Sequence, residues 1–134
     1  EVRAALAAAR QKVGDRRLWA VFEPHMYSRT ALFLNEFAES FGDADEVVVA
    51  DIFASRDSDL SVASAAGLAD AIDRASGIPA LAGGDVDETA RYVAEHLRSG
   101  DAVLVMGAGR SYRIARQLAT ALADGVLDRA RGIG

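Results

Sequence analysis

Residues 18–30 read LWAVFEPHMYSRT, and this segment carries the pattern from which the fold class is predicted. Its first five residues, 18–22, form a compact apolar run with Trp, Val and Phe, which is typical of a buried strand. Pro24 then blocks the strand from continuing, because proline cannot donate to a strand ladder. A loop rich in polar and aromatic side chains follows and leads into a helical pattern.

The helical pattern after this loop is set by aromatic residues. Phe33, Phe37 and Phe41 recur every four residues, which predicts one amphipathic helix from Ser28 to about Gly42. Ser28 is the predicted N-cap, because a serine hydroxyl accepts a hydrogen bond from a free N–H of the first turn. The decisive stretch is therefore a strand, a loop and a helix.

The remaining chain repeats this alternation. Apolar runs predict strands at residues 47–52, 78–81 and 102–106, with helices at 1–12, 65–74, 86–97 and 114–122. Pro79 predicts a strand end or sheet edge for the second of these strands, and the high apolarity of 102–106 predicts a central strand. Strands separated by helices form parallel, right-handed crossovers, so we expect an α/β fold: a three-layer Rossmann-like sandwich with a mostly parallel central sheet. The predicted domain spans residues 1–124, and residues 125–134 form a weakly patterned tail.

Composition narrows the class of protein. The 134 residues suit one domain, and the absence of cysteine removes disulfides and thiolate metal sites. A net charge of −5 without a basic stripe predicts no nucleic-acid partner. The longest apolar runs are too short to cross a bilayer. We therefore expect a cytoplasmic protein that binds neither nucleic acid nor membrane.

The loop after the first strand is the first candidate site, because ligands of such sheets bind beyond the carboxyl ends of the strands. Arg29 lies at a predicted helix N-terminus, where free N–H groups and a forked cation together favour a carboxylate. His25 could donate a hydrogen bond beside it. The alternative is that Arg29 pairs with Glu23 or another surface carboxylate, while His25 and Tyr27 cap the sheet.

The loop Gly107-Ala108-Gly109-Arg110-Ser111 is the second candidate, because glycine lets a ligand approach the backbone. Tyr112 stands where a dinucleotide-binding fingerprint needs a third glycine, which disfavours a nicotinamide-dependent enzyme. The alternative is a tight strand-to-helix turn without a ligand. Weaker candidates for the rim of the same crevice are Asp51, at the end of the second strand, and Arg56 and Asp57 after it; the alternative is that they are ordinary polar residues of a loop.

Three segments resemble the Mur ligase family, in the branch that attaches L-alanine. Residues 21–30 resemble its F-Q-P-H-x-Y-[ST]-R-T signature, residues 44–55 its A-D-x-V-x-x-x-D-I-Y-x-A segment, and residues 103–109 its V-x-x-M-G-A-G ending. The resemblance covers about residues 1–122. This chain departs from the family with Glu23 in place of Gln, and with Met26 and Arg110 at positions where other residues are common.

The resemblance implies a three-domain enzyme of which only the C-terminal, amino-acid-binding domain is present. That enzyme uses ATP and Mg²⁺, bound mainly by a central domain, to activate UDP-N-acetylmuramate for attack by L-alanine in peptidoglycan biosynthesis. Its partners are the N-terminal and central domains of the same protein. No G-x-x-G-K-[ST] sequence occurs here, so we expect no catalytic residue, no metal site and no activity in this fragment alone.

The resemblance also assigns substrate-binding residues. His25 and Arg29 would hold the carboxylate of alanine, and Tyr27 would shape the site. The opposite side of the crevice would be lined by Gly107, Gly109 and Ser111. Two other readings remain: a sibling ligase that recycles a murein tripeptide, and a stand-alone Rossmann-like module that binds a small anion or nucleotide.

Overall fold

A computed structural model describes residues 1–107 and 109–123. It contains one four-stranded sheet in the order β3-β2-β1-β4, and all three strand pairs are parallel. The strands are β1 (Leu18–Glu23), β2 (Glu46–Ala50), β3 (Ala80–Gly84) and β4 (Ala102–Gly107). The predicted parallel sheet is confirmed.

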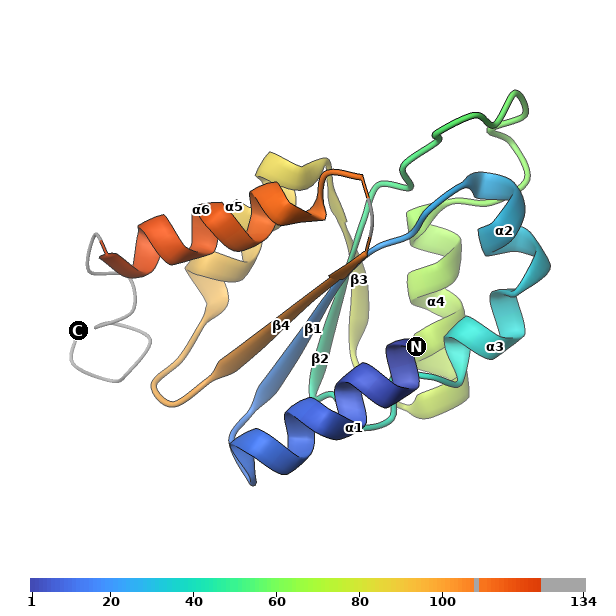
Figure 1. The fold of residues 1–134 in the computed structure, drawn as a ribbon. Helices are drawn as coiled ribbons and strands as arrows, with labels where there is room; N and C mark the ends of the chain where they lie inside the picture. The colour runs from blue at the N-terminus through green and yellow to red at the C-terminus, as the bar shows by residue number, and fades with distance from the viewer. Residues whose placement is uncertain (108, 124–134) are drawn as a thin grey trace.

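Helices cover both faces of this sheet (Figure 1). One face carries α1 (Val2–Val13), α2 (Tyr27–Leu32), α3 (Leu34–Ala38) and α4 (Ala65–Ser76). The other carries α5 (Val86–His96) and α6 (Ser111–Ala123). The three-layer α/β sandwich predicted from the sequence is therefore correct.

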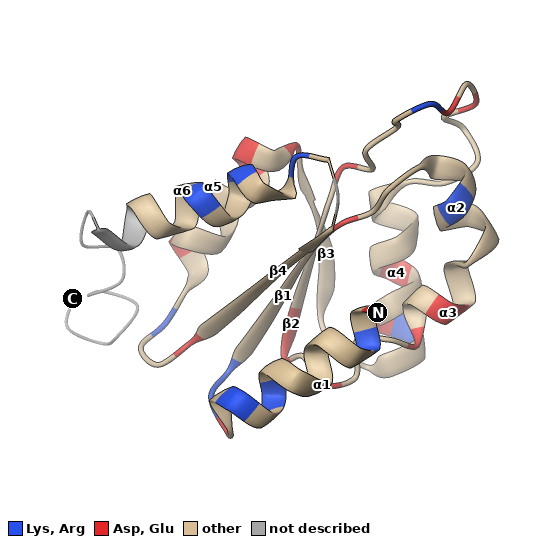
Figure 2. Cartoon of the chain, in the orientation of Figure 1, with Lys and Arg blue, Asp and Glu red and all other residues tan. Residues whose placement is uncertain are grey.

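The core consists of two apolar layers that meet at β1. Leu18, Ala20 and Phe22 pack toward α1 and α4, whereas Trp19 and Val21 pack toward α5 and α6. Every residue of β1 is buried, because successive side chains point to opposite faces and both faces are covered. Figure 2 shows that charged residues lie on helices, in loops and at strand ends.

The position predicted for residues 102–106 is wrong, because β4 is an edge strand. Its side chains are only partly buried. An apolar run indicates that both faces of a strand are covered by helices, which can be true of an edge strand as well as a central one. In β4 the two covering helices are α1 and α6. The edge position predicted from Pro79 is correct, since β3 forms the opposite edge.

The single helix predicted after residue 28 is also wrong, because α2 ends at Leu32 and α3 begins at Leu34. The four-residue spacing of the phenylalanines indicates which of them can reach the core, and it does not require one continuous helix. Phe37 and Phe41 pack against Phe22, with ring centroids 5.5 and 5.7 Å away, whereas Phe33 remains 42% exposed. Phe41 reaches the core from beyond the end of α3.

The predicted N-cap of this region is wrong as well. Met26 occupies the cap position, and Ser28 lies within the first turn of α2. The cap predicted for α5 is correct: Asp85 accepts from the Glu88 N–H at 2.8 Å, and Glu88 accepts from the Asp85 N–H at 3.0 Å. Such a reciprocal pair satisfies two backbone donors that a helix start leaves free.

Asp101 directly precedes β4 and forms a hydrogen-bond network at the amino ends of the strands. Its Oδ2 accepts hydrogen bonds from Trp19 Nε1 at 2.8 Å, Arg17 Nη1 at 3.2 Å and the Arg98 N–H at 2.9 Å. The Asp101 side chain is 3% exposed and Trp19 is 2% exposed. Removing the carboxylate would leave a buried indole N–H without a partner.

Asp101→Ala is therefore expected to lower the free energy of unfolding by about 3 kcal/mol. Asp70→Ala is the matched control, because Asp70 forms only an exposed pair with Arg74 one helical turn away, worth about 0.5 kcal/mol or less. Denaturant unfolding measures both variants. Equal losses in the two would show that the Asp101 network adds nothing.

Two sequence predictions fall outside this description. Residue 124 and the tail at 125–134 lie outside the described residues, so the boundary predicted at 124 stays a prediction.

Within the part of the chain that is described, no helix is long and apolar enough to cross a membrane.

Candidate functional site

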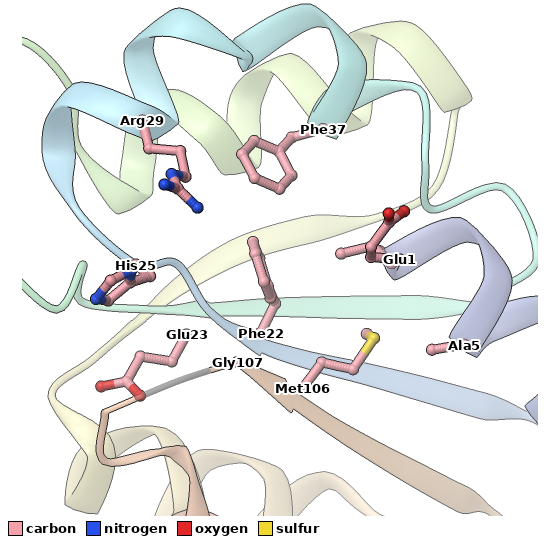
Figure 3. Close-up of a pocket in the computed structure, with 10 residues that line it drawn as sticks. Glu1, Ala5, Phe22, Glu23, His25, Arg29, Phe37, Met106 and Gly107 are labelled. Carbon is pink, nitrogen blue, oxygen red and sulfur yellow. The ribbon is translucent and has the colours of Figure 1, made fainter.

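A cavity of about 460 Å³ lies at the carboxyl ends of β1 and β4. Figure 3 shows its apolar wall and two basic side chains that face it: His25 from the β1–α2 loop and Arg29 from the first turn of α2. Its lining residues are Glu1, Val2, Ala5, Phe22, Glu23, His25, Arg29, Phe37, Met106 and Gly107. An apolar hollow with a few polar groups is typical of a small-molecule site.

Phe53 fixes the backbone of the first loop. The Met26 N–H donates to the Phe53 carbonyl at 2.7 Å, and the Phe53 N–H donates to the Pro24 carbonyl at 2.9 Å. The His25 ring stacks on the Phe53 ring with centroids 5.9 Å apart. These contacts extend the β1–β2 pairing past Pro24, so His25 has a fixed direction.

Met26 adopts an unusual backbone conformation between His25 and Tyr27. Its φ is 67° and its ψ is 131°, in a region that residues with a Cβ rarely enter. The Met26 carbonyl accepts from the Thr30 N–H at 3.1 Å and from Thr30 Oγ1 at 2.8 Å. Thr30 is fully buried, so the surrounding structure holds this bend in place.

The N-terminus of α2 is not open to an anion, contrary to the sequence-based prediction. Asp57 accepts hydrogen bonds from the Ser28 N–H at 3.1 Å and from Ser28 Oγ at 2.8 Å. Desolvation opposes ionisation of Asp57, but the hydrogen bonds from Ser28 and Tyr27 outweigh it and lower the pKa of its carboxyl. The anion at the N-terminus of α2 is therefore the carboxylate of Asp57 from the same chain.

Arg29 remains available as a cation. Its guanidinium points into the cavity (Figure 3), and it forms no ion pair with any residue in 1–107 or 109–123. The pairing of Arg29 with Glu23 that the sequence left open is therefore not found. The anion-binding capacity of this loop comes from the side chain of Arg29 and not from the helix end.

Glu23 faces the second loop. It pairs in register with Gly107, and its Oε1 accepts from the Arg110 N–H at 2.8 Å. It is only 2% exposed, and this burial raises the pKa of its carboxyl. The backbone N–H groups of Arg110 and Ser111 and the charges of Arg110 and His25 partly offset that rise.

The raised pKa predicts a pH dependence of stability. Above pH 4.5 the unfolded chain releases the Glu23 proton, while the folded chain retains it until its higher pKa is reached. Stability due to this group therefore falls as the pH rises through that window. In denaturant unfolding between about pH 4.5 and about pH 7.5, the wild type should lose more stability than Glu23→Gln, in which only the raised pKa of Asp51 still acts in this direction. Parallel curves would contradict it.

Both glycines of the second loop have a packing reason. A Cβ on Gly107, whose φ is +135°, would overlap the Glu23 carbonyl oxygen, and one on Gly109, whose φ is +66°, would lie 2.6 Å from the Phe53 ring. The tight-turn explanation therefore accounts for both residues without a ligand.

A family model described as "Mur ligase, glutamate ligase domain" matches residues 1–109. The chain belongs to the Mur ligase family. Two curated relatives named UDP-N-acetylmuramate–L-alanine ligase are 43% identical over 118 residues in Alkaliphilus metalliredigens and 45% identical over 119 residues in Desulfitobacterium hafniense. Each alignment covers 88% of this chain and 25% or 26% of the relative, so the chain spans about a quarter of their length.

Solved structures of Mur ligases share the fold. A murein peptide ligase from Psychrobacter arcticus superposes with a TM-score of 0.69 at 27% identity, covering 92% of this chain and 25% of that one. A domain from a putative UDP-N-acetylmuramate:L-alanyl-gamma-D-glutamyl-meso-diaminopimelate-type ligase of Haemophilus ducreyi gives a TM-score of 0.64 at 28% identity, covering 90% and 80%. Both confirm a Mur ligase domain.

Three of the residues predicted for the site in this Mur ligase domain meet at one cavity, namely His25, Arg29 and Gly107. Three others do not line it: Tyr27 is half-buried nearby, Ser111 is buried at the start of α6, and Gly109 packs on Phe53. Ala108 lies outside the described residues.

The sequence prediction missed Phe53 and considered Glu23 only as a possible ion-pair partner of Arg29. The signal for Glu23 was present, because it is a charged residue in an otherwise apolar strand and alternation assigns it to the face opposite Phe22. Phe53 had no such signal, since it follows β2 in a loop and meets His25 only through the folded sheet.

No ATP or Mg²⁺ site can be assigned to the described residues of this Mur ligase domain. The phosphate-binding G-x-x-G-K-[ST] pattern is absent from the sequence. Over the described residues, no group of three or more His, Cys, Asp or Glu side chains could hold a metal ion. The chemistry that this chain can supply is recognition of a small anion beside an apolar wall.

Proposed function

We propose that this chain is the amino-acid-binding domain of the ATP-dependent ligase that joins L-alanine to UDP-N-acetylmuramate in peptidoglycan biosynthesis. The observation that carries the proposal is a cavity lined by Arg29 and His25 in a chain 43–45% identical to ligases with that name. The partners are L-alanine, UDP-N-acetylmuramate, ATP and the N-terminal and central domains of the same protein, in the cytoplasm.

The cavity matches the chemistry of alanine. Arg29 binds the carboxylate in two parallel hydrogen bonds, because a guanidinium presents two N–H groups in the same plane. His25 donates beside it from its fixed position on Phe53. The apolar wall made by Phe22 and Met106 receives the methyl group. The amine then faces the open side of the cavity, toward the second substrate.

ATP and Mg²⁺ supply the activation of the UDP-N-acetylmuramate carboxylate, and other parts of the ligase must hold them. The role of this chain is to hold the nucleophile. Holding two reactants in the correct relative position lowers the barrier by the entropy that a chance encounter would cost. Domain closure over the cavity would also exclude water from the site.

A ligase for a murein peptide is the second candidate, because both solved relatives carry such names at 27% and 28% identity. The curated L-alanine ligases are closer at 43% and 45% identity.

The experiment is phosphate release by the full-length protein with ATP, Mg²⁺ and UDP-N-acetylmuramate, with either L-alanine or a murein tripeptide as the amine. We expect release only with L-alanine, and none from residues 1–134 alone. Release with the tripeptide and not with alanine would replace the first candidate by the second. Release with neither would reject both.

A further inference from the structure

Glu23 is a buried carboxylate that the alanine contacts proposed above do not use. It directly precedes Pro24 and His25, and its strand register places it beside Gly107. Figure 3 shows its carboxylate directed away from Arg29, toward the start of α6. Glu23 therefore lies where the two loops of the site meet.

The Glu23 carboxylate accepts hydrogen bonds from free backbone N–H groups at the start of α6. That helix begins at Ser111, and the first N–H groups of any helix lack partners within the helix. Glu23 Oε1 takes the Arg110 N–H at 2.8 Å, and the Ser111 N–H also hydrogen-bonds to the carboxylate. A negative charge at this helix end is further stabilised by the helix dipole.

Phe53 forms a second link between the same two loops. Its ring stacks on His25, lies under the Arg110 guanidinium at 5.7 Å, and leaves no room for a Cβ on Gly109. Stacking fixes a distance but allows sliding, whereas a hydrogen bond to a buried carboxylate also fixes direction. Glu23 thus supplies the directional part of the link.

We propose that Glu23 is a positioning residue of the amino-acid site: it fixes the turn at residues 109–111 beside the His25 segment, and this turn, through Gly109 and Arg110, holds Phe53 against the His25 ring that faces the cavity. Only the identity of the ligand rests on the proposed function. Gly107 and Met106, which form one wall, lie directly before this turn, while His25 and Arg29 face them from the segment after Glu23.

Three variants separate this role from others. Glu23→Asp keeps the charge but is one methylene too short to reach the Arg110 N–H. Glu23→Gln keeps an acceptor oxygen at the same place without the charge, and Glu23→Ala removes both. Glu95→Gln is the control, because it removes one carboxylate from an exposed position on α5. Should Glu23→Ala fail to fold, Glu23→Asp still tests the role.

Two readouts on the full-length protein are needed: amide hydrogen exchange at Arg110 and Ser111, and kcat and KM for L-alanine. In Glu23→Asp we expect exchange faster by about tenfold or more and a KM raised about tenfold, with kcat within about threefold. In Glu23→Gln both should stay within about threefold of the wild type, as in the control.

Wild-type exchange and KM in Glu23→Asp would overturn the proposal. A raised KM with unchanged exchange would also overturn it, because Glu23 would then act on the substrate directly. If the wild-type protein shows no alanine-dependent turnover, the proposed function fails, and exchange at Arg110 still decides whether Glu23 fixes the turn.

Discussion

Arg29→Ala in the full-length ligase is expected to raise the KM for L-alanine about 100-fold, equivalent to about 2.8 kcal/mol of lost binding. The guanidinium is the cation that faces the cavity, and it forms no ion pair with another described residue that would have to be broken first. Loss of a two-pronged contact to a carboxylate removes a charge and two hydrogen bonds together. The KM for UDP-N-acetylmuramate should stay within about threefold, because the proposed role of Arg29 is to bind the carboxylate of alanine only.

Two further variants control this experiment. Arg29→Lys keeps the charge without the planar fork, so it should recover part of the lost affinity. Arg74→Ala removes an exposed arginine on α4 that pairs with Asp70, and it should leave the alanine KM unchanged. An Arg29→Ala enzyme with the wild-type KM would show that this arginine is a solvated surface residue.

Gly107→Ala is expected to lower the free energy of unfolding by about 3 kcal/mol or more. Gly107 has a φ of +135°, which side chains rarely tolerate, and the added Cβ would overlap the backbone oxygen of Glu23. The Cβ is bonded directly to the backbone of β4 and its partner is a backbone oxygen of β1, so neither atom can move without disturbing the β1–β4 register. The variant should also lose alanine-dependent activity, since the cavity wall lies there.

Gly100→Ala is the matched control for this prediction. Gly100 also has a positive φ, +82°, but nothing lies within 4 Å of the Cβ that it would gain. It should therefore cost only the backbone strain, about 1 kcal/mol. Thermal or denaturant unfolding measures both, and equal losses would show that the overlap at Gly107 relaxes without cost.

Most of the sheet could be predicted from local sequence, because each strand is an apolar run bounded by glycine, proline or charge. The strand order could not, since β4 is the most apolar run and yet lies at the edge. The break at Phe33 was equally hidden. Phe37 and Phe41 are positioned by their contacts with the Phe22 ring of β1. These are tertiary contacts, so the spacing of the aromatic residues along the sequence does not show where the helix breaks.

The site could be predicted only in part, for a related reason. His25 and Arg29 are close in sequence, so the short segment from the β1–α2 loop into the first turn of α2 brings them together. Two other residues of the site come from the segment after β2. Asp57 binds Ser28 at the N-terminus of α2, and Phe53 stacks on His25. Their roles depend on the pairing of β1 with β2, which a reading of one segment at a time does not provide.

The most direct test of the central claim is to locate bound L-alanine. Backbone amide chemical shifts of the isotopically labelled full-length ligase, recorded during an L-alanine titration, report which residues change environment. We expect saturable shifts centred on His25, Arg29 and Gly107 that disappear in Arg29→Ala. Shifts centred instead on the second cavity between α2 and α4, near Ala31 and Leu68, or no shifts at saturating alanine, would contradict it.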